Sequence, residues 1–474
     1  MRHDQRDVIV VGGGISGLTA AWHLKNAGID VCLLEAAPRV GGAMQTEHRD
    51  GFLLEKGPFN VIVRNAAFER LLEEVSDDLE VITADRAARA RYIYRAGNLH
   101  AVPSHPIALL GTQLLTMSAK CRLLAGLCAS RRHGAHEETI DQAATRRFGR
   151  EVADTFVSAA ISGIYAGDTH RLSLKACFPN LWRIDTKTRS PLAHGLVSGL
   201  ARVARSRRPS PENGRRAASK PRRWRGLISI NGGLGELAAV LGKRLGADLH
   251  TRCRVETIRA TDRGYALMCT TRAGTGQPYS CRRLLLAGSV QEAARLVAPL
   301  SSKAGTILRS IECASLIVLN LGFSRSDVAH PMKGYGFLVP RSEPDFPLMG
   351  MLWADSIFPH HAPPDRRLIR VFMGGSRDPE AASQTDDDLL ARALGALRPL
   401  LCISGDPVLV DVCRYRAAIP QYVLGYAEKI NSLRSALSEQ ADLHLIGNYL
   451  QGISINDCIR LATEVANQLI QPAG

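Results

Sequence analysis

The 474-residue sequence has no long hydrophobic run, and no stretch approaches the roughly 18 uncharged apolar residues that a membrane-spanning helix needs. Residues 1–11 lack the apolar core and small-residue cleavage site of a secretory leader, so no leader is expected. The 11 cysteines form no CxxC pair and no metal-ligand spacing with histidine, which argues against a disulfide framework and a metal centre. We therefore expect reduced thiols and a cytoplasmic protein.

Acidic residues are scarce relative to basic ones, with 45 against 60, which gives a net charge of +15. Much of this excess lies between Arg202 and Arg225, where ten basic residues accompany one acid. Arginine mixed with proline, serine, asparagine and glycine predicts a solvated loop there, which can attract anionic lipid headgroups. Because the remaining charge is nearly balanced, we expect no nucleic-acid partner.

The length predicts about three domains at ~150 residues each. The composition, 45% hydrophobic and 22% charged, is that of a globular protein and excludes intrinsic disorder. We find no Ser-His-Asp arrangement, carboxylate pair or metal cluster with convincing spacing, so no catalytic side chain is assigned. Redox chemistry in such a chain would belong to a cofactor.

The strongest motif lies in the first 35 residues. A β-branched run, Val8–Val11, is typical of a parallel strand buried on both faces, and Gly12–Gly17 follows it as G-x-G-x-x-G. A helix is predicted over Leu18–Leu24, and a second apolar strand, Val31–Leu34, ends at Glu35. This succession is typical of a dinucleotide-binding unit, although a glycine-rich turn in an unrelated α/β fold is the alternative.

Each position of this motif has a physical task. Gly12 permits the tight turn, Gly14 lets backbone N–H groups approach a pyrophosphate, and Gly17 brings the helix close to the strand. Glu35 can accept a hydrogen bond from a ribose 2′-OH, and its charge disfavours NADP. The candidate cofactor-binding residues here are Gly12, Gly13, Gly14, Ile15, Ser16, Gly17 and Glu35. The motif alone does not separate FAD from NAD.

The segments that follow favour FAD. Between Ala36 and Gly42, an arginine and a glycine pair can place a cation and backbone amides near the phosphates. This pattern resembles the extended motif of the flavin-containing amine oxidase superfamily, and Phe52–Asn60 resembles the segment that passes beside the flavin ring in that superfamily. A simple turn at Gly57 and Pro58 is the alternative. The contacts that the resemblance implies are Ala36, Arg39, Gly41, Gly42, Gly57, Pro58, Phe59 and Asn60.

Two middle segments resemble further regions of the same superfamily. A strand predicted over Cys253–Ile258 is similar to the one that lays a valine backbone against the adenine, which implies a contact at Val255. The buried strand Arg283–Ser289 turns into a predicted helix over Val290–Val297. The nucleotide-binding domain thus resumes after a long interruption, as in the superfamily.

The C-terminal segment 443–459 predicts a strand, a loop and the start of a helix. Amides at this helix start can face the N1–C2=O side of a flavin and stabilise its reduced form. Asp457 can equally be ordinary compensation of the helix dipole. The implied contacts are Gly447, Asn448, Ile453, Ser454 and Ile455.

The whole chain resembles the oxygen-dependent protoporphyrinogen/coproporphyrinogen oxidase family. The segments that carry the resemblance are 447–459 (GNYLQGISINDCI), 161–168 (ISGIYAGD), 334–340 (GYGFLVP) and 419–422 (IPQY). The basic stretch 202–225 is the clear departure. The resemblance implies FAD-dependent oxidation of protoporphyrinogen IX to protoporphyrin IX in haem biosynthesis, by repeated hydride transfer to flavin N5, with dioxygen giving hydrogen peroxide.

The same resemblance implies the substrate contacts. Arg91 matches an arginine that anchors a propionate, a task that suits a guanidinium because its planar fork binds carboxylates in bidentate fashion. The neighbouring alternatives are Arg86, Arg89 and Arg95. Leu338 matches a leucine packed on the macrocycle, and Phe372 or Met373 matches the opposite wall; ordinary core packing is the alternative for each.

The implied fold is α/β: a discontinuous Rossmann-like FAD-binding domain with an inserted helical lobe and an antiparallel-sheet substrate domain. The FAD-binding domain is expected to combine residues 1–85, 216–299 and 426–474. The expected insertions are 86–215, a helical lobe for substrate and membrane association, and 300–425, the substrate domain. The antiparallel sheet is expected to include Ser315–Phe323 and Leu368–Gly374.

The segment Ile107–Cys128 is apolar and helical in pattern, which fits either an interfacial face or the buried side of a cap. We expect a porphyrinogen and dioxygen as partners, a cytoplasmic protein with weak attachment to the inner face of the cell membrane, and leave a homodimer open. The rival functions are oxidation of coproporphyrinogen III, then an amine oxidase or carotenoid desaturase. A nucleic-acid-binding flavoprotein without turnover is a further rival, which the lack of an aromatic platform disfavours.

Overall fold

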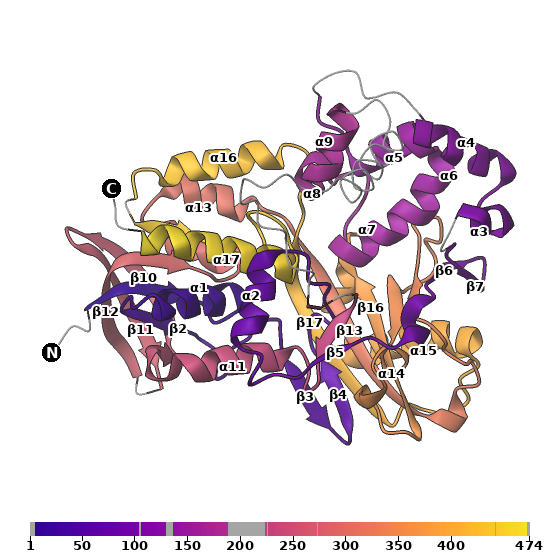
Figure 1. Cartoon of the computed structure of the whole chain (residues 1–474), viewed down its shortest axis with the longest axis horizontal. Helices are drawn as coiled ribbons and strands as arrows, with labels where there is room; N and C mark the ends of the chain where they lie inside the picture. The colour runs from indigo at the N-terminus through magenta and orange to yellow at the C-terminus, as the bar shows by residue number, and fades with distance from the viewer. Residues whose placement is uncertain are drawn as a thin grey trace, which may run out of the picture.

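The computed structural model describes residues 5–103, 106–128, 136–187, 223–224, 226–272, 274–440 and 442–471. Two seven-stranded sheets form the frame of these regions of the chain (Figure 1). The basic stretch 202–225 lies outside the described residues, apart from Arg223 and Trp224. Within the described ranges, no helix combines the length and the apolar character needed to cross a membrane.

The first sheet has the N-terminal strand near its centre. Its strands, in spatial order, are β10 (Arg254–Thr261), β11 (Gly264–Thr271), β12 (Gly274–Leu286), β1 (Gln5–Val11), β2 (Val31–Leu34) and β9 (Leu249–His250), and β18 (Leu443–Leu445) also pairs with β12. Strand β1 pairs in parallel with β12 and β2. Val8 and Val10 enter one core and Ile9 the other, because successive side chains of a strand point to opposite faces.

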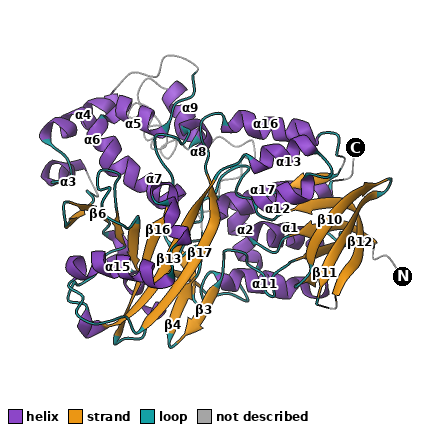
Figure 2. Ribbon diagram, turned by 180° about the vertical axis from the view of Figure 1, so that it is seen from behind, coloured by secondary structure: helices purple, strands orange, loops and turns teal. Residues whose placement is uncertain are grey.

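Helices cover both faces of this sheet (Figure 2). Those whose side chains share a core with Val8 and Val10 are α1 (Ile15–Asn26), α2 (Ala66–Glu74), α11 (Gly235–Leu245) and α17 (Ile455–Ile470). Those on the Ile9 side are α12 (Val290–Val297), α13 (Ser302–Arg309) and α16 (Tyr426–Leu437). Helices α1 and α17, from the two ends of the chain, pack together. The nucleotide-binding unit is therefore discontinuous, as predicted.

The second sheet is largely antiparallel. Its strands, in spatial order, are β17 (Leu409–Pro420), β13 (Cys313–Ser324), β16 (Arg366–Gly374), β15 (Gly350–Trp353), β14 (Gly336–Leu338), β6 (Tyr92–Arg95) and β7 (Asn98–Ala101). The predicted strands Ser315–Phe323 and Leu368–Gly374 fall within β13 and β16. Helix α15 (Asp386–Leu401) shares a core with one face, and Phe52 and Leu54 share another core with Leu368 on the opposite face.

Two shorter pairs join the sheets. These are β3 (Thr46–Arg49) with β4 (Phe52–Glu55), and β5 (Val81–Thr83) with β8 (Ile228–Ile230). The tip of β4 reaches the second sheet, because the Glu55 carbonyl accepts a hydrogen bond from Asn320 Nδ2 at 3.3 Å. The predicted α/β fold class is confirmed.

The helical lobe starts later than its predicted segment, 86–215. The hairpin β6–β7 opens that segment, and β6 pairs with β14, with Phe337 opposite Tyr92. The hairpin joins the second sheet, and its aromatic side chains find partners there: the Tyr94 and Phe346 rings stack at 3.9 Å. The lobe itself comprises α3 (Pro106–Gly111), α4 (Met117–Cys128), α5 (Ile140–Phe148), α6 (Arg150–Val152), α7 (Ser158–Tyr165), α8 (Leu174–Cys177) and α9 (Pro179–Lys187). The domain boundaries themselves stay a prediction.

Candidate functional site

The glycine loop between β1 and α1 has the geometry of a phosphate cradle. Gly12 has a φ of +110°, and its N–H donates to the Leu34 carbonyl at 2.8 Å. A Cβ at Gly17 would lie 1.9 Å from the Gly12 carbonyl oxygen, so any side chain there would force loop and helix apart. A Cβ at Gly14, the N-cap of α1, would meet no atom within 4 Å. Gly14 therefore presents backbone to open space at a helix N-terminus, which fits a pyrophosphate.

Glu35 follows β2, and its side chain contacts this glycine loop. Its Oε2 accepts a hydrogen bond from the Gly13 N–H at 2.5 Å, and its Oε1 accepts one from the Ala37 N–H at 2.7 Å. A Cβ at Gly13 would lie 2.9 Å from the same carboxylate. The structure thus brings the acid and the glycines together, with Ala36 exposed beside them. Ile15 and the buried Ser16 form the first turn of α1. The ribose contact of Glu35 stays a prediction.

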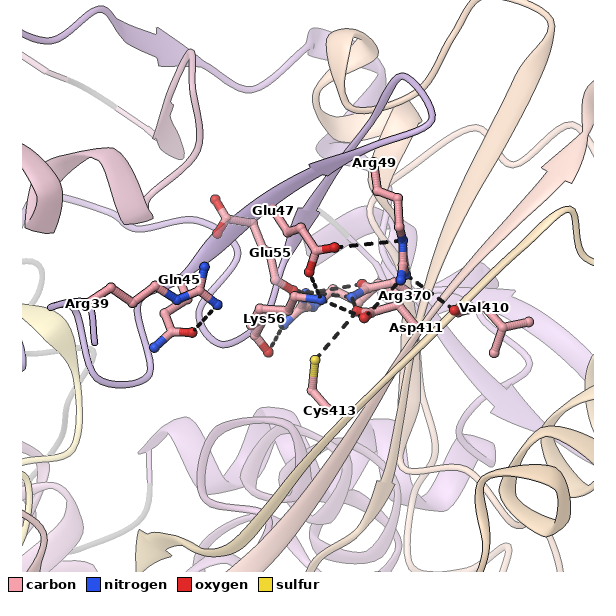
Figure 3. Close-up of polar contacts among 11 residues, drawn as sticks. Arg39, Gln45, Glu47, Arg49, Glu55, Lys56, Arg370, Val410, Asp411 and Cys413 are labelled. Carbon is pink, nitrogen blue, oxygen red and sulfur yellow. Dashed lines mark hydrogen bonds and ion pairs between the residues drawn. The ribbon is translucent and has the colours of Figure 1, made fainter. Parts of the chain in front are cut away.

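The Gly41–Gly42 pair also reaches the glycine loop. The Gly41 N–H donates to the Gly13 carbonyl at 2.8 Å, and a Cβ at Gly42 would lie 3.3 Å from the Gly14 Cα. Arg39 is exposed, and its Nη2 donates to Gln45 Oε1 at 2.8 Å (Figure 3). The structure therefore places the glycine pair at the cradle and gives the arginine a protein partner on the surface.

Val255 approaches the same region through the start of β10. The Cys253 N–H donates to the Glu35 carbonyl at 2.8 Å, two residues before Val255. The Val255 side chain is buried, and its carbonyl accepts a hydrogen bond from Arg295 Nη2 at 2.6 Å. Val255 thus lies two residues beyond the backbone contact with Glu35, and its contact with the adenine stays a prediction.

The segment 55–60 connects β4 to the second sheet. Gly57 is required there, because a Cβ would lie 2.0 Å from the Ala43 carbonyl oxygen. Pro58 is half-buried and Phe59 is buried. Asn60 Nδ2 donates to the Tyr335 hydroxyl at 2.8 Å. The segment predicted to pass beside the flavin is thus held against the second sheet.

Glu55 is a buried acid at the start of this segment, with 1% of its surface exposed. Its carboxyl accepts hydrogen bonds from the Leu234 N–H at 2.5 Å and the Thr46 hydroxyl at 2.8 Å. Burial raises the pKa of Glu55 from 4.5 to about 7, against the lowering effect of these hydrogen bonds and of Arg370. Some of the Glu55 population is therefore protonated near neutral pH.

We expect Glu55→Gln to make the protein less sensitive to alkaline pH. An acid whose pKa is higher in the folded protein than in the unfolded chain lowers the free energy of unfolding as the pH rises between the two values. The shift from 4.5 to about 7 corresponds to roughly 3 kcal/mol, lost above pH 4.5 and fully lost above pH 7. The melting temperature of the variant, relative to that of the wild type, should be higher at pH 8 than at pH 5. A gap that is equal at both pH values would contradict this.

The loop 447–454 is the second arm of the candidate site, and Tyr422 holds it. The Tyr422 hydroxyl donates to the Asn448 carbonyl at 2.6 Å and accepts from the Gly452 N–H at 2.8 Å, so it closes the loop on both sides. A Cβ at Gly447 would lie 2.6 Å from the Tyr449 ring. Tyr422 lies in the IPQY segment, but sequence reasoning assigned it no role.

A capping box starts α17 after this loop. Ser454 Oγ accepts from the Asp457 N–H at 3.2 Å, and Asp457 Oδ2 accepts from the Ser454 N–H at 3.3 Å. Asp457 therefore caps the helix. The Ser454 amide is bonded within the protein, and its role toward the flavin stays a prediction. Ile453 and Ile455 flank this cap and are half-buried.

One of the predicted substrate residues, Arg91, is linked to segment 55–60 through Tyr335. The Arg91 guanidinium stands over the Tyr335 ring, 5.3 Å from its centroid, while Arg91 itself is exposed. Leu338 is half-buried against α7, since a Cβ at Gly163 would lie 2.9 Å from its Cδ2. Tyr335, which was not predicted, is therefore the bridge between Arg91 and Asn60.

Phe372 and Met373 point to opposite faces of β16, because neighbouring side chains of a strand alternate. Phe372 is half-buried and near Arg370, whose guanidinium carbon lies 5.5 Å from its ring. Met373 is fully buried in the core that includes Leu397 of α15. Of the two alternatives for the substrate wall, Met373 lies in this core and Phe372 points to the other face; the assignment of the wall stays a prediction.

Comparison with known proteins extends this picture to the whole chain. The family model of flavin containing amine oxidoreductases matches residues 15–470. Coproporphyrinogen III oxidase of Bacillus subtilis (strain 168) is 27% identical over 475 residues, which cover 97% of each chain. Chloroplastic protoporphyrinogen oxidase of Nicotiana tabacum is 28% identical over 476 residues, which cover 98% of this chain and 85% of the relative.

A solved structure shows the same fold. A protein of Exiguobacterium sp. 255-15, provisionally named a protoporphyrinogen oxidase, superposes with a TM-score of 0.79 at 23% identity over 99% of both chains. The expected FAD cofactor and oxidoreductase class are confirmed by the family match and the curated relatives. We conclude that the chain is an FAD-dependent oxidoreductase that belongs to the flavin containing amine oxidoreductase family.

Proposed function

We propose that this chain oxidises protoporphyrinogen IX to protoporphyrin IX, with FAD and dioxygen. The observation that carries the proposal is the contact between the predicted flavin-binding segment and the predicted substrate-binding residues. Asn60, in the segment expected beside the flavin, donates a hydrogen bond to the Tyr335 hydroxyl. The guanidinium of Arg91 lies over the Tyr335 ring. A propionate held by Arg91 would bring the macrocycle next to that segment. Full-length similarity to porphyrinogen oxidases supports the same substrate class.

In this proposal the side chains of the site position the substrate and exclude water. Arg91 orients the macrocycle through one propionate, while Leu338 and Phe372 provide apolar walls on either side. Bound FAD supplies the redox chemistry: each cycle removes a hydride and a proton from the porphyrinogen and ends with dioxygen reduced to hydrogen peroxide. No side chain is assigned an acid or base role.

Coproporphyrinogen III is the second candidate substrate. The B. subtilis relative named for it aligns over 97% of its own length, against 85% for the tobacco relative. Coproporphyrinogen III has two further propionates in place of vinyl groups, so its binding would need further cations. Identity to the two kinds of relative is nearly equal, and turnover must separate the substrates.

The experiment is to purify the protein, record its flavin spectrum and follow porphyrin fluorescence in air with each porphyrinogen. Faster oxidation of protoporphyrinogen IX supports the first proposal, and faster oxidation of coproporphyrinogen III replaces it with the second. A flavin that is reduced by polyamines or phytoene, and by neither porphyrinogen, would overturn both and assign an amine oxidase or a desaturase.

We expect Arg91→Ala to weaken porphyrinogen binding by about 1.5–3 kcal/mol, because a charged hydrogen bond is lost. This corresponds to a KM raised roughly ten- to hundredfold. Arg89→Ala is the matched control, since Arg89 is also exposed and lies two residues before Arg91. An unchanged KM for Arg91→Ala, or an equal change in the control, would place the propionate anchor elsewhere.

Weak attachment to a membrane surface is a further element of the proposal. It is supported by Met117 of α4 and Leu181 of α9, whose surfaces are 64% and 54% exposed on the helical lobe. Co-sedimentation with vesicles that contain anionic lipid tests it, and protein that stays in the supernatant at low salt would contradict it. A homodimer stays a prediction.

A further inference from the structure

Arg370 of β16 is a buried cation that binds the backbone of segment 55–57. Only 1% of its surface is exposed. Its Nη1 donates to the Glu55 carbonyl and to Asn320 Oδ1, the latter at 3.2 Å. Its Nη2 donates to the Gly57 carbonyl and, at 3.4 Å, to the Lys56 carbonyl (Figure 3). One side chain thus fixes three consecutive carbonyls.

The acceptors of Arg370 are all neutral. Among the described residues, no carboxylate forms an ion pair with it, and its Nε has no hydrogen-bond partner. Burying a charge without an ion-pair partner costs several kcal/mol. The fold therefore maintains a positive charge at this point that its own described acids do not neutralise by contact.

Neighbouring cations of the same region are paired. Lys56 Nζ lies 2.5 Å from Asp411 Oδ1 and 2.7 Å from Glu47 Oε2 (Figure 3). Arg367, three residues before Arg370 on the same strand, lies 3.0 Å from Asp355 Oδ2. Lys56 and Arg367 thus have carboxylate partners in the part of the chain that the structure describes, and the more deeply buried Arg370 has none.

The charge of Arg370 lies near two aromatic side chains that are predicted for the site. Its guanidinium carbon is 5.8 Å from the Phe59 ring and 5.5 Å from the Phe372 ring. Phe59 belongs to the segment predicted to pass the flavin, and Phe372 to the predicted substrate wall. A ligand that gains negative charge beside these two rings would be stabilised by a cation in a medium of low polarity.

We propose that Arg370 is an electrostatic and positioning residue of the flavin site, whose charge favours the reduced over the oxidised form of the bound isoalloxazine. Reduction by two electrons with uptake of one proton adds one negative charge to the ring, and Arg370 lowers its energy. Its Nη groups also keep segment 55–57 in place. This inference rests on the proposed function to the extent that segment 55–60 lies beside the flavin.

The test measures the reduction potential of bound FAD in purified holoenzyme by equilibration with redox dyes, without porphyrinogen. Arg370→Gln should shift the equilibrium toward oxidised flavin at least about tenfold, which lowers a two-electron potential by about 30 mV. Arg370→Lys keeps the charge and should shift it much less. Arg367→Gln, the matched control on the same strand, should leave it unchanged. An unchanged potential in Arg370→Gln, or an equal shift in the control, overturns the inference.

Glu55→Gln gives an independent readout if Arg370→Gln does not fold. Among the acids near Arg370, Glu55 has the strongest charge effect on its guanidinium, and the Glu55 carboxylate is buried. Removing that negative charge should raise the potential at pH 8, opposite in sign to Arg370→Gln, and an unchanged potential counts against Arg370. Wild-type protein that binds FAD but oxidises no porphyrinogen overturns the proposed function alone, and protein that binds no FAD overturns both.

Discussion

A Gly14→Val variant is expected to fold like the wild type and to lose its flavin. The new side chain meets no atom within 4 Å of its Cβ, and Gly14 has a φ of −72°, which valine can adopt. The same open space is where the backbone amides of the cradle must approach the cofactor phosphates. We expect FAD binding to weaken by about 3 kcal/mol or more, roughly a hundredfold in Kd. Circular dichroism, flavin absorbance and titration of apoprotein with FAD measure the effect.

The control for this variant is Gly395→Val in α15, where a Cβ also meets no atom within 4 Å. It should fold and keep its flavin. Gly17→Ala provides the contrast, because its Cβ would lie 1.9 Å from the Gly12 carbonyl and disturb the fold itself. Full flavin content in Gly14→Val would show that the phosphates do not lie at this loop.

Tyr422→Phe is expected to destabilise the loop 447–454 strongly. The substitution leaves the Asn448 carbonyl and the Gly452 N–H without their shared partner in a region where Tyr422 is only 2% exposed. Each buried group left unsatisfied costs about 1–3 kcal/mol, so for the two groups we expect a loss of about 2–6 kcal/mol in the free energy of unfolding. Since this loop carries the predicted contacts Gly447 and Asn448, flavin retention should fall with it. Thermal unfolding and flavin content are the measurements.

Tyr449→Phe is the matched control for this change. The Tyr449 hydroxyl is buried and has no hydrogen-bond partner among the described residues, although its ring packs under Gly447. Removing it should therefore leave stability unchanged or raise it, by up to about 1–3 kcal/mol. If Tyr449→Phe were as damaging as Tyr422→Phe, the hydrogen bonds of Tyr422 would not be what holds the loop.

Some questions that the sequence left open needed the direction of a side chain. The pair Phe372 and Met373 is adjacent in sequence, and only the position of α15 decides that Met373 faces the core. An arginine within the apolar run Leu368–Met373 was a visible signal for Arg370 that sequence reasoning did not use. Its backbone acceptors in segment 55–57 lie more than 300 residues away in the chain, so no local pattern could name them.

The local nucleotide motif could be predicted because its elements are neighbours in sequence. The run from β1 through Gly12–Gly17 to Glu35 depends on strand propensity, turn geometry and helix start, all of which act within a few residues. The predicted helix over Val290–Val297 coincides with α12 for the same reason. The capping box of Ser454 and Asp457 is equally local. It agrees with the interpretation in which Asp457 serves the start of the helix.

The amino-acid sequence by itself determined the α/β class, the glycine cradle, the FAD cofactor and the family, because these follow from short-range patterns and from motifs spread along the whole chain. The tertiary structure decided which distant residues meet: Arg91 with Tyr335 and Asn60, Tyr422 with the 447–454 loop, and Arg370 with segment 55–57. Such contacts depend on how the whole chain folds around the two sheets and the segments between them. That fold is set by burial summed over many residues and leaves no periodic trace in any one segment.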